Sequence, residues 1–179
     1  GANVRSALLD EARRFVESAV LDGGRYADLV TAHTDPAAAL DELYADAPRV
    51  GVQGLGAVWS TYAHSDQTSP IRRGLFVRNA LLCQPLPPPP PNAGGVPDVD
   101  PNATTRERFR QHTDDPFCAS CHQYIDDVGF GFERFDAVGA WRETENGVAI
   151  DPSGNLNDRE GLGTGTDGAY DNLPALGAL

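Results

Sequence analysis

The sequence predicts a mainly α-helical chain with long loops rich in glycine and proline, and three observations support this. Residues 3–20 place apolar side chains at helical spacing, with Asp, Glu and Arg on the opposite face. Ser69 and Pro70 form a helix start, a capping side chain followed by proline at the first helical position. Thr104 and Glu107 have the spacing of a capping box, which starts a short helix.

Further signals along the chain divide it into three segments. Residues 1–48 contain a second helix start at Asp35 and Pro36, and this helix is expected to run to about Asp46. Residues 49–102 contain a helix expected over 70–83, followed by five consecutive prolines at 87–91. A proline run is typical of a stiff polyproline II spacer, and less often of a docking ligand. Residues 103–179 hold the densest group of aromatic side chains and end in turns rich in Gly, Asn and Asp.

The negative charge of the chain argues against nucleic acids and anionic membranes as binding partners. The formal net charge is -12, and all 14 basic residues are Arg. Such a chain repels nucleic-acid phosphates and anionic membrane surfaces, so an electrostatic partner is expected to carry a basic patch. No apolar run approaches the roughly 20 residues that would span a bilayer.

The strongest chemical signal is the motif Cys118-Ala119-Ser120-Cys121-His122. Two thiols three residues apart can bond to one edge of a porphyrin, and the following His then ligates the iron from below. The motif therefore predicts one covalently bound haem c, held by Cys118 and Cys121, with His122 as the proximal axial ligand. The expected fold is a cytochrome-c-like haem core with a helical annex and long Gly/Pro-rich loops.

Two other interpretations of the cysteines remain open. Cys118 and Cys121 can form a disulfide, as CxxC pairs do in thioredoxin-like proteins, although the βαβ setting of those proteins is not seen here. Cys83, Cys118, Cys121 and His122 can also form a structural zinc site. Cys83 is otherwise an odd thiol, expected to be buried or paired with another chain.

A haem needs apolar walls and partners for its propionates. Phe130 and Phe132 follow the motif and are candidates for the walls, and Arg142 is a candidate propionate partner because its guanidinium binds carboxylates in a fork. The chain has no Met, which removes a common second axial ligand. The distal candidate is therefore His64, which lies in a loop before a capped helix, and the alternative is His112.

The second axial ligand decides between two classes of function. Two His ligands give a closed iron that exchanges electrons, whereas an open position allows peroxidase-like chemistry. One-electron transfer is the favoured function, and a haem peroxidase-like enzyme is the alternative from another class. Haem attachment implies a periplasmic or extracellular location. Because residues 1–10 lack the features of a signal peptide, the export signal is expected upstream.

Several segments resemble the C-terminal domains, of unknown function, of planctomycete-type cytochrome c proteins. These segments are residues 68–74, 82–85, 105–108, 111–112, 118–122, 129–133, 135–139 and 141–142. The resemblance implies haem attachment at the motif, export, and a role in a larger multidomain electron-transfer protein. The expected partners are a redox protein with a basic patch and other cytochrome chains or domains. The resemblance also implies that residues 1–48 are the tail of a truncated upstream domain. We expect residues 49–102, a helix and a polyproline linker, to pack on a haem domain formed by residues 103–179.

Overall fold

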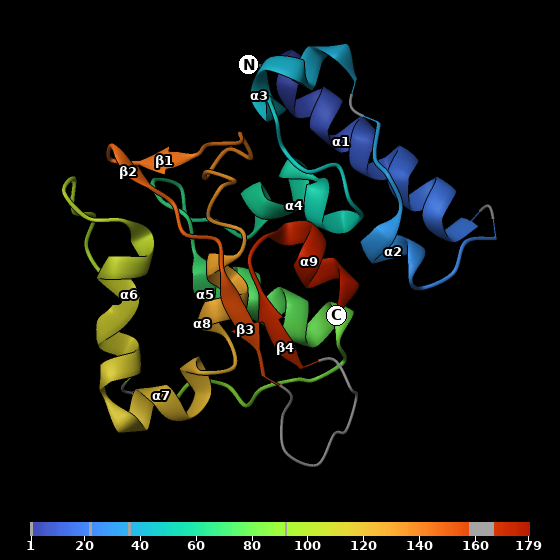
Figure 1. Ribbon diagram of the computed structural model, residues 1–179. Coiled ribbons are helices and arrows are strands. Elements are labelled where there is room, and N and C mark those ends of the chain that lie inside the picture. The colour runs from blue at the N-terminus through green and yellow to red at the C-terminus, as the bar shows by residue number, and fades with distance from the viewer. Residues whose placement is uncertain (1, 22, 36, 92, 158–166) are drawn as a thin grey trace.

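The computed structural model describes residues 2–21, 23–35, 37–91, 93–157 and 167–179 (Figure 1). The side chains of Ala2, Gln111 and His112 lie outside this description. The described elements are mostly short helices, then two small sheets and a final short helix. The helices of the first half are α1 (Ala2–Val16), α2 (Asp28–Thr31), α3 (Asp41–Tyr44), α4 (Gly56–Thr61) and α5 (Pro70–Phe76). Those of the second half are α6 (Thr105–Asp114), α7 (Pro116–His122), α8 (Asp126–Phe130) and α9 (Leu173–Ala178).

Tighter or wider helical turns and two hairpin-like sheets complete the fold. The π turns η1 (Glu17–Leu21) and η4 (Val77–Leu81) continue α1 and α5, and the 3₁₀ turns are η2 (Ala38–Leu40) and η3 (Val52–Gly54). Strand β1 (Thr144–Glu145) pairs antiparallel with β2 (Val148–Ala149), and β3 (Gly154–Leu156) pairs antiparallel with β4 (Gly168–Tyr170). Asn146 and Gly147 join β1 to β2 with positive φ angles of 52° and 80°, as a tight hairpin turn requires.

The local helix signals are confirmed. The Ser69 side chain caps α5 by accepting from the Arg72 N–H, and Pro70 is the first helical residue. At the start of α6, Thr104 and Glu107 form both halves of the capping box. The helix expected over residues 3–20 exists as α1 and η1. The helix expected from Asp35 is shorter, since its described part consists of η2 and α3, and Pro36 lies outside the described residues.

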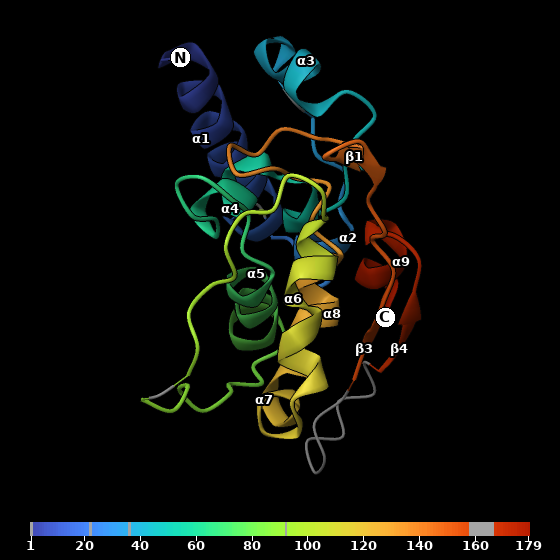
Figure 2. The ribbon, with the colours of Figure 1, turned by 90° about the vertical axis from the view of Figure 1, so that its left-hand side faces the viewer.

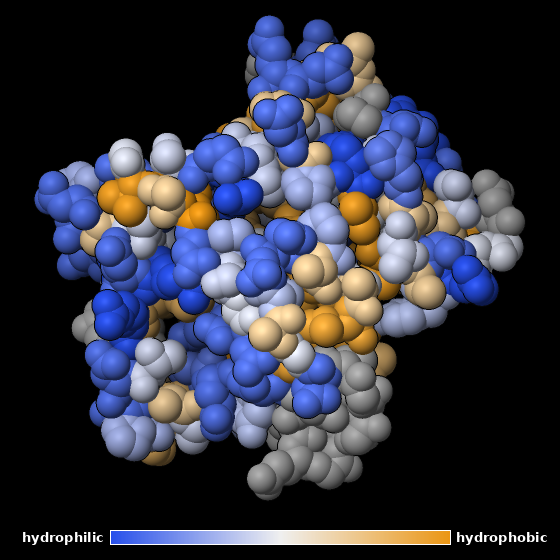
Figure 3. All heavy atoms as spheres, viewed as in Figure 1, coloured by the Kyte–Doolittle hydropathy of each residue, from blue (hydrophilic) through white to orange (hydrophobic). Residues whose placement is uncertain are grey.

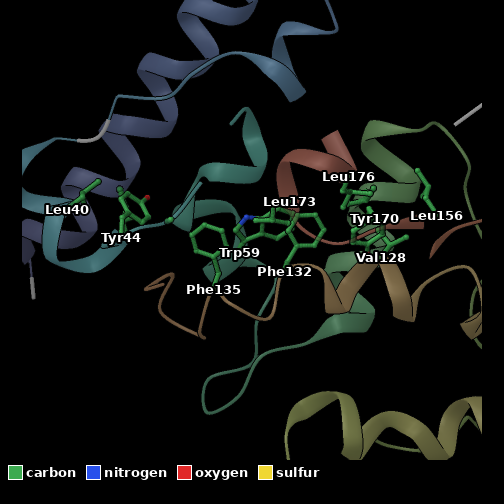
Figure 4. Close-up of a cluster of buried hydrophobic side chains, with 13 residues drawn as sticks. Leu40, Tyr44, Trp59, Val128, Phe132, Phe135, Leu156, Tyr170, Leu173 and Leu176 are labelled. Atoms are coloured by element: carbon green, nitrogen blue, oxygen red, sulfur yellow. The ribbon is translucent and has the colours of Figure 1, made fainter. Parts of the chain in front are cut away.

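One apolar core joins both ends of the chain (Figure 4). Trp59 of α4 is fully buried, and its ring stacks on Phe132 with the ring centroids 3.8 Å apart. Leu40 and Tyr44 from the first segment enter the same core, and so does Leu173 of α9. Residues 1–48 therefore pack on the rest of the chain through buried apolar surface. The three predicted segment boundaries themselves stay predictions.

Helices α5 and α8 cross so closely that only glycine fits at the contact. A Cβ atom added to Gly74 would lie 2.2 Å from the Ile125 carbonyl oxygen. On the other helix, a Cβ atom added to Gly129 would lie 2.0 Å from the Pro70 carbonyl oxygen. Both clashes are with main-chain atoms, which cannot turn aside as a side chain can. This crossing fixes α8, and with it the residues that follow the Cys118–His122 motif.

Gly129→Ala is expected to destabilise the fold by about 1–3 kcal/mol, because the α5–α8 crossing must open to admit a methyl group. The measurement is the free energy of unfolding in urea. Gly95→Ala is the matched control, since nothing lies within 4 Å of an added Cβ there. Equal midpoints for the two variants would contradict the close crossing.

Arg73 of α5 is buried at the centre of the fold. Its Nη1 donates to the carbonyl oxygens of Phe132 and Phe135, both at 2.7 Å, and to the Glu133 carboxylate at 3.2 Å. Its Nη2 donates to the carbonyl oxygens of Trp59 at 3.3 Å and of Asp136 at 3.0 Å. One guanidinium thus holds the irregular chain of residues 132–136 against α4 and α5.

The predicted cytochrome-c-like haem core is wrong. In residues 103–179 the chain forms α6, α7 and α8, then the two small sheets and α9, and no cytochrome fold surrounds the motif in the part of the chain described. The physical reason is that aromatic side chains expected around a haem pack elsewhere. Phe132 and Phe135 stack on Trp59 in the central core. Figures 1 and 2 show α7 at one end of the molecule, beyond the last turn of α6.

Candidate functional site: the CxxCH helix

The Cys118–His122 motif lies on α7, and local chemistry explains why a helix starts there. The Asp115 side chain accepts from the main-chain N–H groups of Phe117, at 2.8 Å, and Cys118, at 3.2 Å. Pro116 occupies the first helical position, where its missing N–H costs nothing. In a helix, residues three and four apart share a face. Cys118, Cys121 and His122 therefore lie on one side of α7.

The thiols of the motif are accessible. Cys118 and Cys121 are partly exposed and Cys83 is exposed, and all three are free cysteines. No residue of α7 is buried. Phe117, next to Cys118, has 72% of its surface exposed and supplies apolar area beside the thiols. The surface seen in Figure 3 over α6 is mainly hydrophilic. The expected burial of Cys83 is therefore wrong, and its pairing with another chain stays a prediction.

The structure does not favour the two alternative interpretations of the cysteines. Cys118 and Cys121 are not joined in a disulfide. Across the described residues, no three His, Cys, Asp or Glu side chains come together in a way that could hold a metal ion. The set Cys83, Cys118, Cys121 and His122 is therefore not assembled as a zinc site.

His122 is held by a carboxylate. Its Nδ1 lies 2.8 Å from Oδ1 of Asp126, the first residue of α8, and the Asp126 side chain is only 2% exposed. A metal-ligating His commonly binds the metal through one ring nitrogen while the other donates to a carboxylate or carbonyl. The residues present therefore fit the predicted haem: two accessible thiols and an imidazole oriented through Nδ1. The spacing of four residues between His122 and Asp126 was a signal in the sequence that the prediction missed.

The residues predicted as haem walls and as propionate partner all contact other parts of the fold. Phe132 is fully buried and its ring stacks on Trp59, and its role as a haem wall stays a prediction. Phe130 ends α8 and is 5% exposed, with the Arg106 guanidinium 4.5 Å from its ring centroid. Arg142 donates to the Glu133 carbonyl oxygen and lies 3.5 Å from the carboxylates of Glu133 and Glu145. The structure thus gives Arg142 a role in binding the buried Glu133, and its role at a propionate stays a prediction.

The distal candidate His64 lies in the loop between α4 and α5. Gln67 in this loop accepts from Arg108, and Thr68 lies within hydrogen-bond distance of Thr105, so the loop is attached to the first turns of α6. The motif follows the last turn of α6, and a helix of this length spans about 15 Å. The structure therefore places His64 at the other end of α6 from the motif. Burial, and then the nearby Arg72 charge, lower the pKa of His64, which favours the neutral imidazole.

The alternative distal candidate, His112, lies on α6 two residues before that helix ends. Its main chain is therefore near α7, while its side chain lies outside what the structure describes. The choice between His64 and His112 stays a prediction.

A mainly helical domain with a CxxCH motif on an exposed short helix is the class of protein that the fold and the site define. Residues 49–145 match the family described as PSCyt3: Protein of unknown function (DUF1588), and the chain belongs to that family. This is a domain family associated with planctomycete cytochrome c proteins, so the resemblance seen in the sequence is confirmed at that level. The search of curated proteins and the search of solved structures found no match.

The sequence predicts no membrane-spanning segment. Among the helices of the described residues, none combines the length and the apolar character that crossing a bilayer demands.

Proposed function

We propose that this domain carries one haem c, bonded to Cys118 and Cys121 and ligated by His122, and that it serves one-electron transfer. The observation that supports the proposal is the motif on α7 together with the Nδ1 contact between His122 and the buried Asp126. When bound, haem c accepts one electron from a reduced donor protein and passes one electron to an oxidised acceptor.

The residues of the chain perform the attachment and the positioning. Each thiol adds across one vinyl C=C bond of the porphyrin: the sulfur bonds to one carbon, and the S–H hydrogen ends on the other. These additions need no oxidant or reductant. His122 supplies its Nε2 to the metal, and Asp126 holds the ring through Nδ1.

The surface of the chain favours a basic partner. The net charge is -12, and α7 is flanked by the exposed Asp114 and Asp115. An acidic surface steers a partner with a complementary basic patch and raises its association rate. We propose a periplasmic or extracellular location, because covalent haem attachment takes place outside the cytoplasm.

The chain, preceded by an export signal and produced in a host that matures c-type cytochromes, tests the proposal. We expect an intact mass increased by one haem under denaturing conditions, and the pyridine haemochrome spectrum of a haem with two thioethers. An unchanged mass in exported, folded protein would overturn the proposal. Cyanide added to the ferric protein, or CO added to the ferrous protein, separates the two classes of function, since rapid uptake would replace electron transfer with peroxidase-like chemistry.

A further inference from the structure

The Asp126 carboxylate that contacts His122 is more deeply buried than the imidazole itself. The Asp126 side chain is 2% exposed, whereas that of His122 is 21% exposed. The carboxylate therefore lies on the inner side of the imidazole, where the effective dielectric constant is lower than in water. A negative charge at such a position acts on its neighbour with little screening by salt.

The position of Asp126 is fixed by the fold. It begins α8, and α8 is clamped against α5 by the close approaches at Gly74 and Gly129. The preceding residue, Ile125, is buried and donates its N–H to the His122 carbonyl oxygen at 3.0 Å. The distance between Oδ1 and Nδ1 is thus set by the packing of two helices and by a main-chain bond, and it does not depend on a mobile surface side chain.

We propose that Asp126 is a positioning residue that sets the reduction potential of this site. A carboxylate that accepts the Nδ1 proton increases the electron density on the imidazole and makes Nε2 a more basic ligand. The buried negative charge and the more basic ligand both stabilise ferric over ferrous iron. Asp126 therefore lowers the potential, which makes the reduced domain a stronger electron donor. This inference rests on the proposed function.

The variant Asp126→Asn tests the inference, because the side-chain oxygen remains as an acceptor while the charge is removed. We expect the equilibrium constant for reduction by a fixed donor to rise about tenfold, which corresponds to about 59 mV for one electron. A changed ferric EPR spectrum is expected as a second readout, since a merely structural change away from the ligand would not alter it.

Asp127→Asn is the matched control, with the same charge change one residue along α8. The Asp127 carboxylate lies 3.7 Å from Arg106 and accepts from the Asn155 N–H, and its side chain is 41% exposed. We expect its reduction equilibrium to stay within about twofold of the wild type, because a solvent-exposed charge is screened.

The outcomes separate this inference from the proposed function. If the wild type carries haem but Asp126→Asn and Asp127→Asn shift the potential equally, or neither shifts it, the role of Asp126 is overturned and the haem proposal stands. If the wild type carries no haem, both fail. If Asp126→Asn alone fails to retain haem, Asp126→Glu keeps the charge. Recovery of haem and of a low potential in that variant supports the inference, and its failure to recover either overturns it.

Discussion

Arg73→Met is expected to destabilise the fold by about 3–5 kcal/mol, the usual cost of removing one partner of a buried ion pair. The Arg73 guanidinium is fully buried and donates to four main-chain carbonyl groups and to Glu133. Without it, these acceptors lose donors in a place that water does not reach, and the buried Glu133 loses its nearer cation and keeps only the Arg142 guanidinium at 3.5 Å. Since domains are stable by only about 5–15 kcal/mol, this loss would remove a large share of the total free energy of unfolding.

The measurement is the free energy of unfolding in urea, compared with Arg72→Ala. Arg72 immediately precedes Arg73 on α5, is exposed, and donates to the Ala63 carbonyl oxygen. We expect its loss to cost about 1 kcal/mol or less. Arg73→Lys is expected to fall between the two, because an ammonium group cannot reproduce the planar fork of donors. A fully stable Arg73→Met variant would mean that residues 132–136 hold their shape without the guanidinium.

The stability of Arg73→Met should also depend on pH. Burial raises the pKa of the Glu133 carboxyl, and the Arg73 charge opposes that rise. Removing Arg73 therefore raises the pKa of Glu133 in the folded state. The pKa of Glu133 in the unfolded state stays at its ordinary value. A carboxyl whose pKa is higher in the folded state stabilises the fold while it is protonated, at pH values below its unfolded pKa. This stability is lost as the pH rises through the folded pKa. Relative to the wild type, Arg73→Met is expected to be least destabilised in acid and most destabilised at neutral pH.

What could be predicted from the sequence is what depends on neighbouring residues. The Ser69 cap of α5 and the Thr104–Glu107 box of α6 use side chains within three residues of the groups they bind, so spacing alone reveals them. The hairpin turn at Asn146 and Gly147 is similarly local. The CxxCH motif belongs to the same group, because its chemistry lies in five consecutive residues.

What could not be predicted depends on partners far along the chain. Phe132 lies near the motif in sequence, and its burial against Trp59 depends on a helix from another segment. Arg73 resembles a surface residue by type, since arginine is rarely buried without partners, and its partners are carbonyl groups that no sequence pattern marks. For these reasons the sequence predicts a haem core around Phe130 and Phe132, whereas the actual core lies between α4, α5 and residues 132–136.

The contact of Asp126 with His122 is local in sequence, but the burial of Asp126 depends on residues far along the chain. The spacing of four residues to His122 is visible in the sequence, and on a helix it would bring the two side chains together. In the structure the pair bridges the end of α7 and the start of α8, and the burial of the carboxylate comes from the crossing with α5. The spacing could thus have suggested the contact between His122 and Asp126. The burial of the carboxylate, on which its proposed effect on the reduction potential depends, is a property of the fold.

Changing both Cys118 and Cys121 to Ser is expected to abolish covalent haem, with complete loss of the added mass under denaturing conditions. Each single variant is expected to retain one thioether and a shifted haemochrome spectrum, because one vinyl group then stays unreacted. The fold should survive, since no residue of α7 is buried and Ser is close to Cys in size. Urea unfolding without haem should therefore begin from a folded baseline.

Cys83→Ser is the control for this prediction, because Cys83 is an exposed thiol outside the motif. We expect the full haem mass and an unchanged spectrum in that variant. Haem that remained covalently bound in the double variant would place the attachment at another residue, and loss of haem in Cys83→Ser would mean that this thiol takes part in maturation. Because α7 contributes exposed thiols and no buried packing, attachment can be tested here separately from folding, which is not possible where the haem itself forms the core.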